Sequence, residues 1–315
     1  MPLVALTSYP HTRPLVDGAV RPEGLDLEFD PLVNGIFPAF RVMARTLRYD
    51  VSEFGISTAL CAVERGLPVR LLPVFVTRRY DHVGMFVRED SPVRSVADLA
   101  GARIAVKSFT VTDVVWSTGI LLESLGRLNG ITWQVTGDEH LAEQKLPDSA
   151  RAVEGSPTQL LRAGEVDAIF DPRAGGEPGI RPLFPDVREA ERNWLATKGY
   201  VPPHHTIVVR ESLLERYPDC GRRLYEAFRA AKEPFLHDFA GGVDVLAGDD
   251  SPTGPRHDYG VEKTEDLVGR DPVPYGLTAN WRALEDIVGY LKHMGLLSGA
   301  RPVEEFFVPV DGDAG

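Results

Sequence analysis

Short apolar runs alternate with longer amphipathic segments along the whole chain of 315 residues. The short runs are rich in Val, Ile and Phe, and they predict β-strands at 3–6, 25–29, 50–55, 69–76, 83–87, 104–106, 131–135, 166–170 and 207–209. The longer segments carry apolar residues at helical spacing, and they predict helices at 35–47, 59–64, 96–99, 114–125, 156–164, 278–294 and, with an interruption near Pro218, 213–239. Strands that alternate with helices in this way are typical of α/β proteins with mainly parallel sheets.

The strand–helix pattern runs through the chain twice, which predicts two lobes. The chain crosses between them near 83–88 and 206–210, so we assign residues 1–85 and 206–315 to lobe I and residues 86–205 to lobe II. The strands at 69–76 and 83–87 flank a polar segment and are predicted to pair with each other. Ligands of such sheets bind beyond the carboxyl ends of the strands, which predicts a ligand cleft between the lobes. Residues 241–255, rich in Gly, Asp, Ser and Pro, predict a surface loop.

Composition narrows the class of protein. A hydrophobic share of 43% and a charged share of 25% are those of a globular chain. The net charge of -12 argues against a nucleic-acid partner, and no stretch has the roughly 20 apolar residues of a membrane span. The first residues contain no leader pattern, so we expect a cytoplasmic protein, and a homo-oligomer is left open. Cys61 and Cys220 stand far apart and offer neither a disulfide framework nor a metal motif.

Hydroxyl-rich turns follow several of the predicted strands. The turn at 107–112 contains Lys107, Ser108, Thr110 and Thr112 at a predicted helix start, where unpaired N–H groups and the helix dipole favour an anion. A simple helix cap by Thr112 is the alternative. The turns at 8–13 and 57–58 repeat the pattern, and together the three predict one anion-binding site. We expect Lys107 and Arg13 to clamp a substrate carboxylate.

Six segments give the chain a resemblance to the 4,5-dihydroxyphthalate decarboxylase family, and they extend over nearly all of it. They are YPHTR at 9–13, GAVRPEG at 18–24, DVSE at 50–53, DLAGARIAV at 98–106, GYVPPHHT at 199–206 and GRDPVPYGLTAN at 269–280. The resemblance implies a type II periplasmic-binding-protein-like fold. It also implies an enzyme that releases CO2 from a hydroxylated aromatic carboxylate, such as 4,5-dihydroxyphthalate, and needs no organic cofactor.

Histidines are the candidate catalytic residues, because loss of CO2 from such a ring needs a base and an acid near neutral pH. His205 matches the single histidine of the family and is assigned to proton exchange, with His82 as its partner and His11 in reserve. A core or hinge histidine is the alternative for His82, and a surface position at a helix start is the alternative for His11. The substrate-binding candidates are Tyr9, Thr12, Arg13, Ser57, Thr58, Arg79, Lys107, Ser108, Thr110, Thr112, His204 and Asn280.

Other kinds of chemistry lack support in the sequence. No compact spacing of His, Cys, Asp or Glu predicts a metal site. Motifs for acyl transfer, nucleotide hydrolysis and dinucleotide binding are also missing. Two alternatives stay open: a non-catalytic protein that binds a small anion, and a lyase similar to the chorismate dehydratases that share the fold. Fold by itself does not decide among the three.

Overall fold

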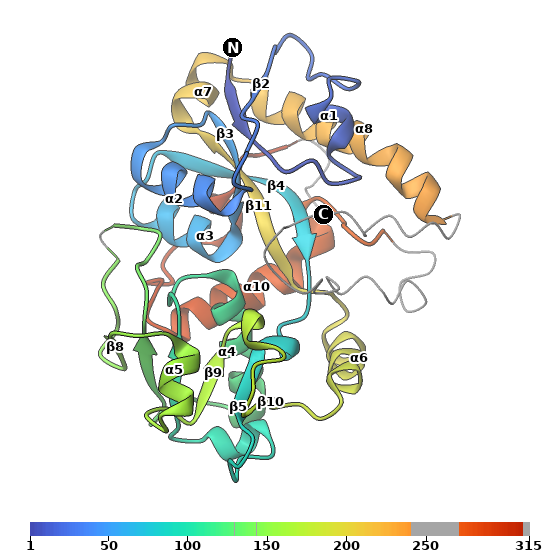
Figure 1. Cartoon of the computed structure of the whole chain (residues 1–315). Helices are drawn as coiled ribbons and strands as arrows, with labels where there is room; N and C mark the ends of the chain where they lie inside the picture. The colour runs from blue at the N-terminus through green and yellow to red at the C-terminus, as the bar shows by residue number, and fades with distance from the viewer. Residues whose placement is uncertain (129, 143, 241–270, 311–315) are drawn as a thin grey trace. The chain divides into compact units, whose positions relative to one another are not determined.

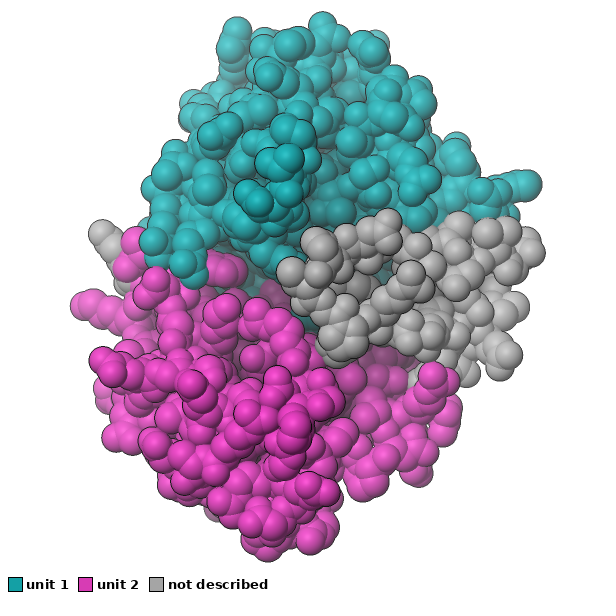
Figure 2. All heavy atoms as spheres, in the orientation of Figure 1, with its two compact units in different colours: residues 1–79, 203–281, 301–315 teal, residues 80–202, 282–300 magenta. Residues whose placement is uncertain are grey.

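The structure is a computed structural model that describes residues 1–128, 130–142, 144–240 and 271–310. The chain divides into two compact units, each described here by itself (Figure 2). Unit 1 contains the described residues of 1–79, 203–281 and 301–315, and unit 2 contains those of 80–202 and 282–300. The predicted boundaries at 85/86 and 205/206 lie six and three residues later than those of the units, and all of the C-terminal region was predicted to belong to lobe I. Residues 282–300 instead group with unit 2, where Tyr290 packs edge-on against Trp116.

Unit 1 is built on a five-stranded sheet in the order β2-β1-β3-β11-β4 (Figure 1). Strands β2, β1 and β3 are parallel, and β11 runs antiparallel to both of its neighbours, β3 and β4. The strands are β1 (Leu3–Ala5), β2 (Glu28–Phe29), β3 (Val51–Gly55), β4 (Val69–Arg78) and β11 (Pro203–Arg210).

Helices cover both faces of this sheet. Helices α2 and α3 lie on one face, and α1 and α8 lie on the other, where apolar side chains from alternate strand positions form the core (Figure 1). The helices are α1 (Arg13–Val16), α2 (Phe37–Thr46), α3 (Ile56–Glu64), α7 (Glu211–Arg216) and α8 (Cys220–Ala240), with the 3-10 turn η4 (Val303–Phe306).

The antiparallel direction of β11 determines which residues meet at the carboxyl edge of the sheet. In the register, Ile207 lies opposite Glu53 and His205 lies opposite Gly55, so β11 begins where β3 ends. The pairing of β11 with β4 shifts register between Pro203 and Ile207, and such irregularities re-aim side chains at a sheet edge. The ends of β1 and β3 and the beginning of β11 therefore converge.

Unit 2 contains a six-stranded mixed sheet in the order β10-β5-β9-β6-β7-β8. Strands β9, β6, β7 and β8 are parallel, whereas β5 is antiparallel to both β9 and β10. The strands are β5 (Met85–Arg88), β6 (Arg103–Val106), β7 (Thr132–Val135), β8 (Ala150–Ala152), β9 (Ala168–Phe170) and β10 (Ile180–Pro182). The helices are α4 (Thr112–Leu125), α5 (Pro157–Arg162), α6 (Val187–Lys198) and the greater part of α10 (Leu277–His293), with the 3-10 turns η1 (His82–Gly84), η2 (Val96–Leu99) and η3 (Pro172–Ala174).

The structure agrees with the predicted α/β class and changes some of its details. The predicted pairing of the strands at 69–76 and 83–87 is wrong, because β4 pairs with β11 and β5 pairs with β9 and β10. The helical segment at 213–239 is interrupted near Pro218 as predicted, because α7 ends at Arg216 and α8 begins at Cys220. The predicted loop at 241–255 lies outside the described residues. In the part of the chain that is described, no helix combines the length and the apolarity that a bilayer crossing needs.

Candidate functional site

The centre of the candidate site is a hydrogen-bonded pair of side chains at the carboxyl edge of the unit 1 sheet. His205 Nδ1 lies 2.7 Å from Glu53 Oε1, although the two residues are 152 positions apart in the chain. Glu53 is the third residue of β3, and the side chain of His205 projects from the beginning of β11. The pairing of β3 with β11 therefore brings the two side chains together, and the sequence around either residue does not predict the contact.

Glu53 is a fully buried carboxylate that accepts hydrogen bonds from three donors. Its Oε1 accepts from the Tyr9 hydroxyl at 2.7 Å as well as from His205, and its Oε2 accepts from the Thr7 backbone N–H at 3.0 Å. Burial alone would raise the pKa of Glu53, but the hydrogen bond and electrostatic attraction of His205 and the hydrogen bonds from Thr7 and Tyr9 outweigh it and hold the pKa below the ordinary 4.5. Glu53 is therefore ionised at neutral pH.

This carboxylate fixes the orientation and the proton position of His205. An ionised carboxylate only accepts hydrogen bonds, so Nδ1 carries the proton of this bond, and Nε2 is the nitrogen left to exchange a proton with a ligand. Phe40 contacts the imidazole edge-on at 5.0 Å between ring centroids, and Phe37 does so at 6.0 Å. The side chain of His205 keeps 11% of its surface exposed. Nε2 can take a proton as a base and return it as an acid.

His11 lies beside this pair but is enclosed. It is 2% exposed, its ring stacks parallel to Tyr9 at 5.4 Å, and Phe235 covers another side. Burial is the main cause that lowers the pKa of His11 to about 4, although the Val76 backbone and the Glu53 charge oppose it. The alternative of a surface position at a helix start is therefore wrong. A neutral ring that supports Tyr9 is the role that this geometry supports.

The remaining candidates near the first turns differ in exposure. The Thr12 hydroxyl is buried and accepts from the Tyr9 N–H at 2.9 Å while donating to the Thr7 carbonyl at 2.6 Å, so it shapes the turn that carries Tyr9. Arg13 is exposed at the first position of α1. Ser57 and Thr58 are buried in the first turn of α3.

His204 and Asn280 are both buried in unit 1. Burial, followed by the charge of Arg79, lowers the pKa of His204 well below its ordinary value, so its ring is neutral. Asn280 accepts a hydrogen bond from Arg78 and donates to the carbonyls of Pro274 and Gly276 at 3.0 and 2.7 Å. These contacts give Asn280 a structural role, since they tie the start of α10 to the end of β4.

The predicted anion seat at 107–112 in unit 2 already holds a carboxylate of the chain. Glu139 Oε2 accepts from the Ser108 hydroxyl at 2.8 Å and from the Thr110 N–H at 3.0 Å, and Glu139 accepts further from the Phe109 N–H and the Thr110 hydroxyl. Lys107 is exposed, and Thr112 is the first residue of α4. The turn thus binds a carboxylate, as its composition predicted, but this carboxylate is the side chain of Glu139 and not a ligand.

His82 lies in unit 2 within an aromatic environment. Its ring packs against Phe184 and Trp194 at 5.0 and 5.8 Å, and burial lowers its pKa to about 4. Within unit 1 the imidazole of His205 forms its hydrogen bond with the Glu53 carboxylate. The pairing of His82 with His205 joins residues of the two units and stays a prediction, as does the cleft between the lobes.

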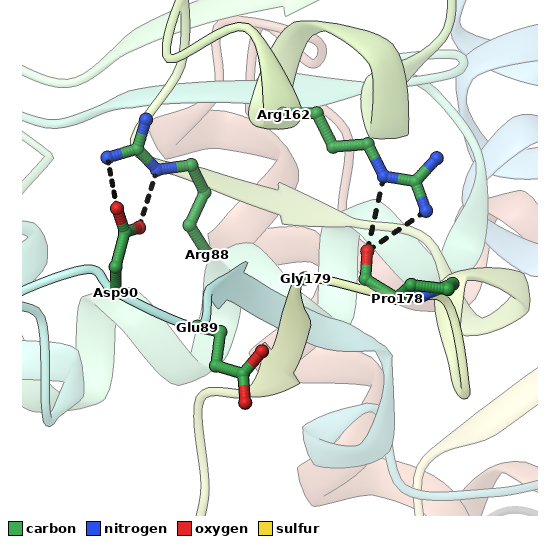
Figure 3. A pocket seen from close by; sticks show the side chains of 6 residues that line it. All are labelled: Arg88, Glu89, Asp90, Arg162, Pro178 and Gly179. Atoms are coloured by element: carbon green, nitrogen blue, oxygen red, sulfur yellow. Dashed lines mark hydrogen bonds and ion pairs between the residues drawn. The ribbon is translucent and has the colours of Figure 1, made fainter.

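A shallow depression of about 540 Å³ on unit 2 has no feature of a binding site (Figure 3). Its two guanidinium groups are already paired: Arg88 contacts Asp90 at 3.0 Å, and Arg162 contacts Glu177 at 2.7 Å and the Pro178 carbonyl at 3.1 Å. Because these cations are neutralised by their neighbours, we assign no ligand to the depression.

The contact of Glu53 with His205 and the aromatic pair Phe37 and Phe40 were not predicted. A signal existed for Glu53, since a charged residue within a buried strand needs a buried partner. Glu139 follows a predicted strand, but its local sequence does not identify its partners, which lie about 30 positions earlier in the chain.

The comparisons with known proteins agree on one family. No protein-family model matches the chain. A 4,5-dihydroxyphthalate decarboxylase of Comamonas testosteroni is 31% identical over 97% of this chain and 96% of its own length. Another of the same name from Pseudomonas putida is 32% identical over 62% of this chain and 82% of its own length.

Solved structures with low sequence identity support the fold. A putative sulfonate-binding protein of Methylobacillus flagellatus has a TM-score of 0.54 at 15% identity, over 98% of this chain and 90% of its own. A Candida albicans protein described as having the generic periplasmic-binding-protein fold has a TM-score of 0.53 at 13% identity, over 100% and 99%. The chain thus has a periplasmic-binding-protein-like fold, and by its similarity to the two decarboxylases it belongs to the 4,5-dihydroxyphthalate decarboxylase family.

Proposed function

We propose that this protein is a decarboxylase that releases CO2 from a hydroxylated aromatic carboxylate, with 4,5-dihydroxyphthalate as the leading substrate, and that it does so without an organic cofactor. Family membership supports the reaction and the substrate class. The observation that carries the mechanism is the contact between Glu53 and His205 at 2.7 Å. It provides a histidine with a fixed proton on Nδ1 and a second nitrogen that can exchange a proton with a ligand.

The reaction replaces a carboxylate on the ring by a proton. The hydroxyl para to the leaving carboxylate gives up its proton, and electron density moves to the carbon that bears this carboxylate. That carbon takes up a proton from His205 Nε2, the carbon–carbon bond breaks with its electron pair returning to the ring, the hydroxyl regains its proton, and CO2 leaves. One proton is consumed for each CO2. General acid–base help of this kind contributes roughly 10²–10⁴-fold to a rate.

Residues around the dyad have supporting roles in this proposal. Glu53 is a positioning residue, since it acts on the substrate only through His205. Tyr9 and His205 both bond to Glu53 Oε1, so the Tyr9 hydroxyl partly neutralises the negative charge that faces the imidazole. For the substrate carboxylates the exposed cations Arg13 and Lys107 remain our candidates, because fixed cations orient carboxylates well.

The test is CO2 release from a panel of aromatic carboxylates, followed together with ring absorbance. We expect the wild-type protein to release CO2 from 4,5-dihydroxyphthalate and His205→Asn to slow the chemical step by about 100-fold or more, with substrate binding retained. Wild-type turnover by His205→Asn in single-turnover assays would exclude the assigned role.

A non-catalytic solute-binding protein is the second candidate function. The fold that this chain shares with a sulfonate-binding protein supports it. Binding of a panel member without any CO2 release would favour it. Loss of water from a hydroxylated cyclohexadiene carboxylate added to the panel, detected as a gain of aromatic absorbance without CO2, would favour a dehydratase-like lyase.

A further inference from the structure

Phe37 is an exposed aromatic residue that contacts the proposed catalytic histidine. It keeps 57% of its surface exposed, whereas Phe40, one helical turn later, is 2% exposed. Single exposed apolar residues are common on protein surfaces and need no explanation by themselves. Phe37 differs from a scattered surface residue because its ring lies 6.0 Å from the His205 ring, centroid to centroid.

The start of α2 holds this ring in place. Ile36, the residue before the helix, is buried, and Pro38 restricts the backbone of the first turn. Phe40 contacts the Phe37 ring edge-on at 5.8 Å and is itself packed against Phe54. The exposed part of the Phe37 ring is therefore a fixed apolar surface next to His205.

We propose that Phe37 is the specificity-determining surface on which the planar ring of the substrate stacks, beside His205. This inference rests on the proposed function and names what selects an aromatic ring. Aromatic rings attract each other in offset-stacked or edge-to-face arrangements at centroid distances of roughly 4.5–7 Å. The exposed area of Phe37 is available for such a contact.

The angle between the two side chains suits the chemistry. The planes of Phe37 and His205 meet at 82°. A substrate ring stacked parallel to Phe37 is then nearly perpendicular to the imidazole, and the plane of the imidazole contains the direction normal to the substrate ring. Protonation of a ring carbon requires a proton that approaches along this normal. A proton on Nε2 lies in the imidazole plane, so the arrangement allows that approach.

The experiment compares two dicarboxylates that carry the same charge. Phthalate has a planar ring, and cis-cyclohexane-1,2-dicarboxylate has a saturated one, and the affinity of each is measured by calorimetry. For Phe37→Leu, which keeps apolar bulk and loses the ring, we expect phthalate to bind about 3- to 10-fold more weakly and the saturated probe to bind within about 2-fold of wild type. Phe37→Trp keeps an aromatic surface and retains the preference for phthalate. Val33→Ala alters another exposed apolar residue, 87% exposed, and is the matched control.

The outcomes separate this inference from the proposed reaction. Equal weakening of both probes by Phe37→Leu, unchanged phthalate binding, or wild-type protein that binds neither probe would each overturn the role of Phe37. If no panel member releases CO2 but the preference for phthalate depends on Phe37, the proposed decarboxylase function is wrong and the role of Phe37 in binding an aromatic ring is retained. Circular dichroism confirms that each variant is folded before its affinity is interpreted.

Discussion

Replacing Glu53 by glutamine tests the centre of the site, because it removes one charge and changes one acceptor while keeping the shape. In the wild-type protein Oε1 accepts from Tyr9 and His205, and Oε2 accepts from the Thr7 N–H. One of these positions becomes an NH2 group in Glu53→Gln, so at least one donor faces another donor. A hydrogen bond to a charged group contributes about 1.5–3 kcal/mol, and we expect a loss of stability of this size at pH 7.

The loss should depend on pH in a defined direction. The pKa of Glu53 in the folded protein lies below its ordinary value of 4.5. A depressed carboxyl pKa stabilises the folded state above the pKa of the unfolded chain, and this stabilisation disappears as the pH falls through the folded value. The difference in free energy of unfolding between wild type and Glu53→Gln should therefore be constant from pH 7 to about pH 5 and shrink below about pH 4.5.

Urea unfolding followed by far-UV circular dichroism measures this difference. Tryptophan fluorescence is less suitable, since three of the four tryptophans, Trp116, Trp133 and Trp194, belong to unit 2, and the fourth, Trp281, is exposed at the boundary of unit 1. Asp50→Asn is the matched control, because Asp50 also accepts a backbone hydrogen bond, from Leu3 at 2.9 Å, but does not contact the imidazole. Only Glu53→Gln should also slow the chemical step, by about 10²–10⁴-fold, since its His205 can adopt the wrong tautomer. A Glu53→Gln protein with wild-type stability at pH 7, or with a deficit that persists unchanged to pH 3.5, would refute the reasoning.

Three further substitutions test other parts of the structure. His11→Phe removes a histidine whose pKa falls from 6.5 to about 4 on folding; the wild type should lose up to about 3 kcal/mol more stability than the variant between pH 6.5 and 4, and parallel stability curves would contradict this. Glu139→Gln places an NH2 group opposite N–H and hydroxyl donors at the turn before α4, so it should lower the free energy of unfolding of unit 2 by about 1.5–3 kcal/mol. Urea unfolding followed by tryptophan fluorescence measures this, and an unchanged midpoint would show that the carboxylate is dispensable. Gly119→Ala would place a Cβ against the Tyr290 ring, well inside van der Waals contact, and should lower stability by about 1–3 kcal/mol despite the helix propensity of alanine; a more stable variant would disprove the close approach.

The sequence by itself determined the α/β class and most of the elements, because apolar periodicity and turn residues act over a few positions. Strand β3, helix α2 and the turn before α4 lie where local patterns predicted them. The affinity of the turn at 107–112 for a carboxylate also followed from local chemistry, since hydroxyls and free N–H groups at a helix start attract anions wherever they occur.

Only the tertiary structure decided which groups meet. Periodicity does not give strand direction, so the antiparallel β11, which brings His205 to Glu53, could not be read from it. For the same reason β4 and β5, adjacent in sequence, were wrongly paired, although they belong to different sheets. The occupant of the anion turn, Glu139, was likewise set by the path of the chain. Contacts between residues distant in sequence depend on how sheets are ordered, and that order is fixed by the packing of the whole unit.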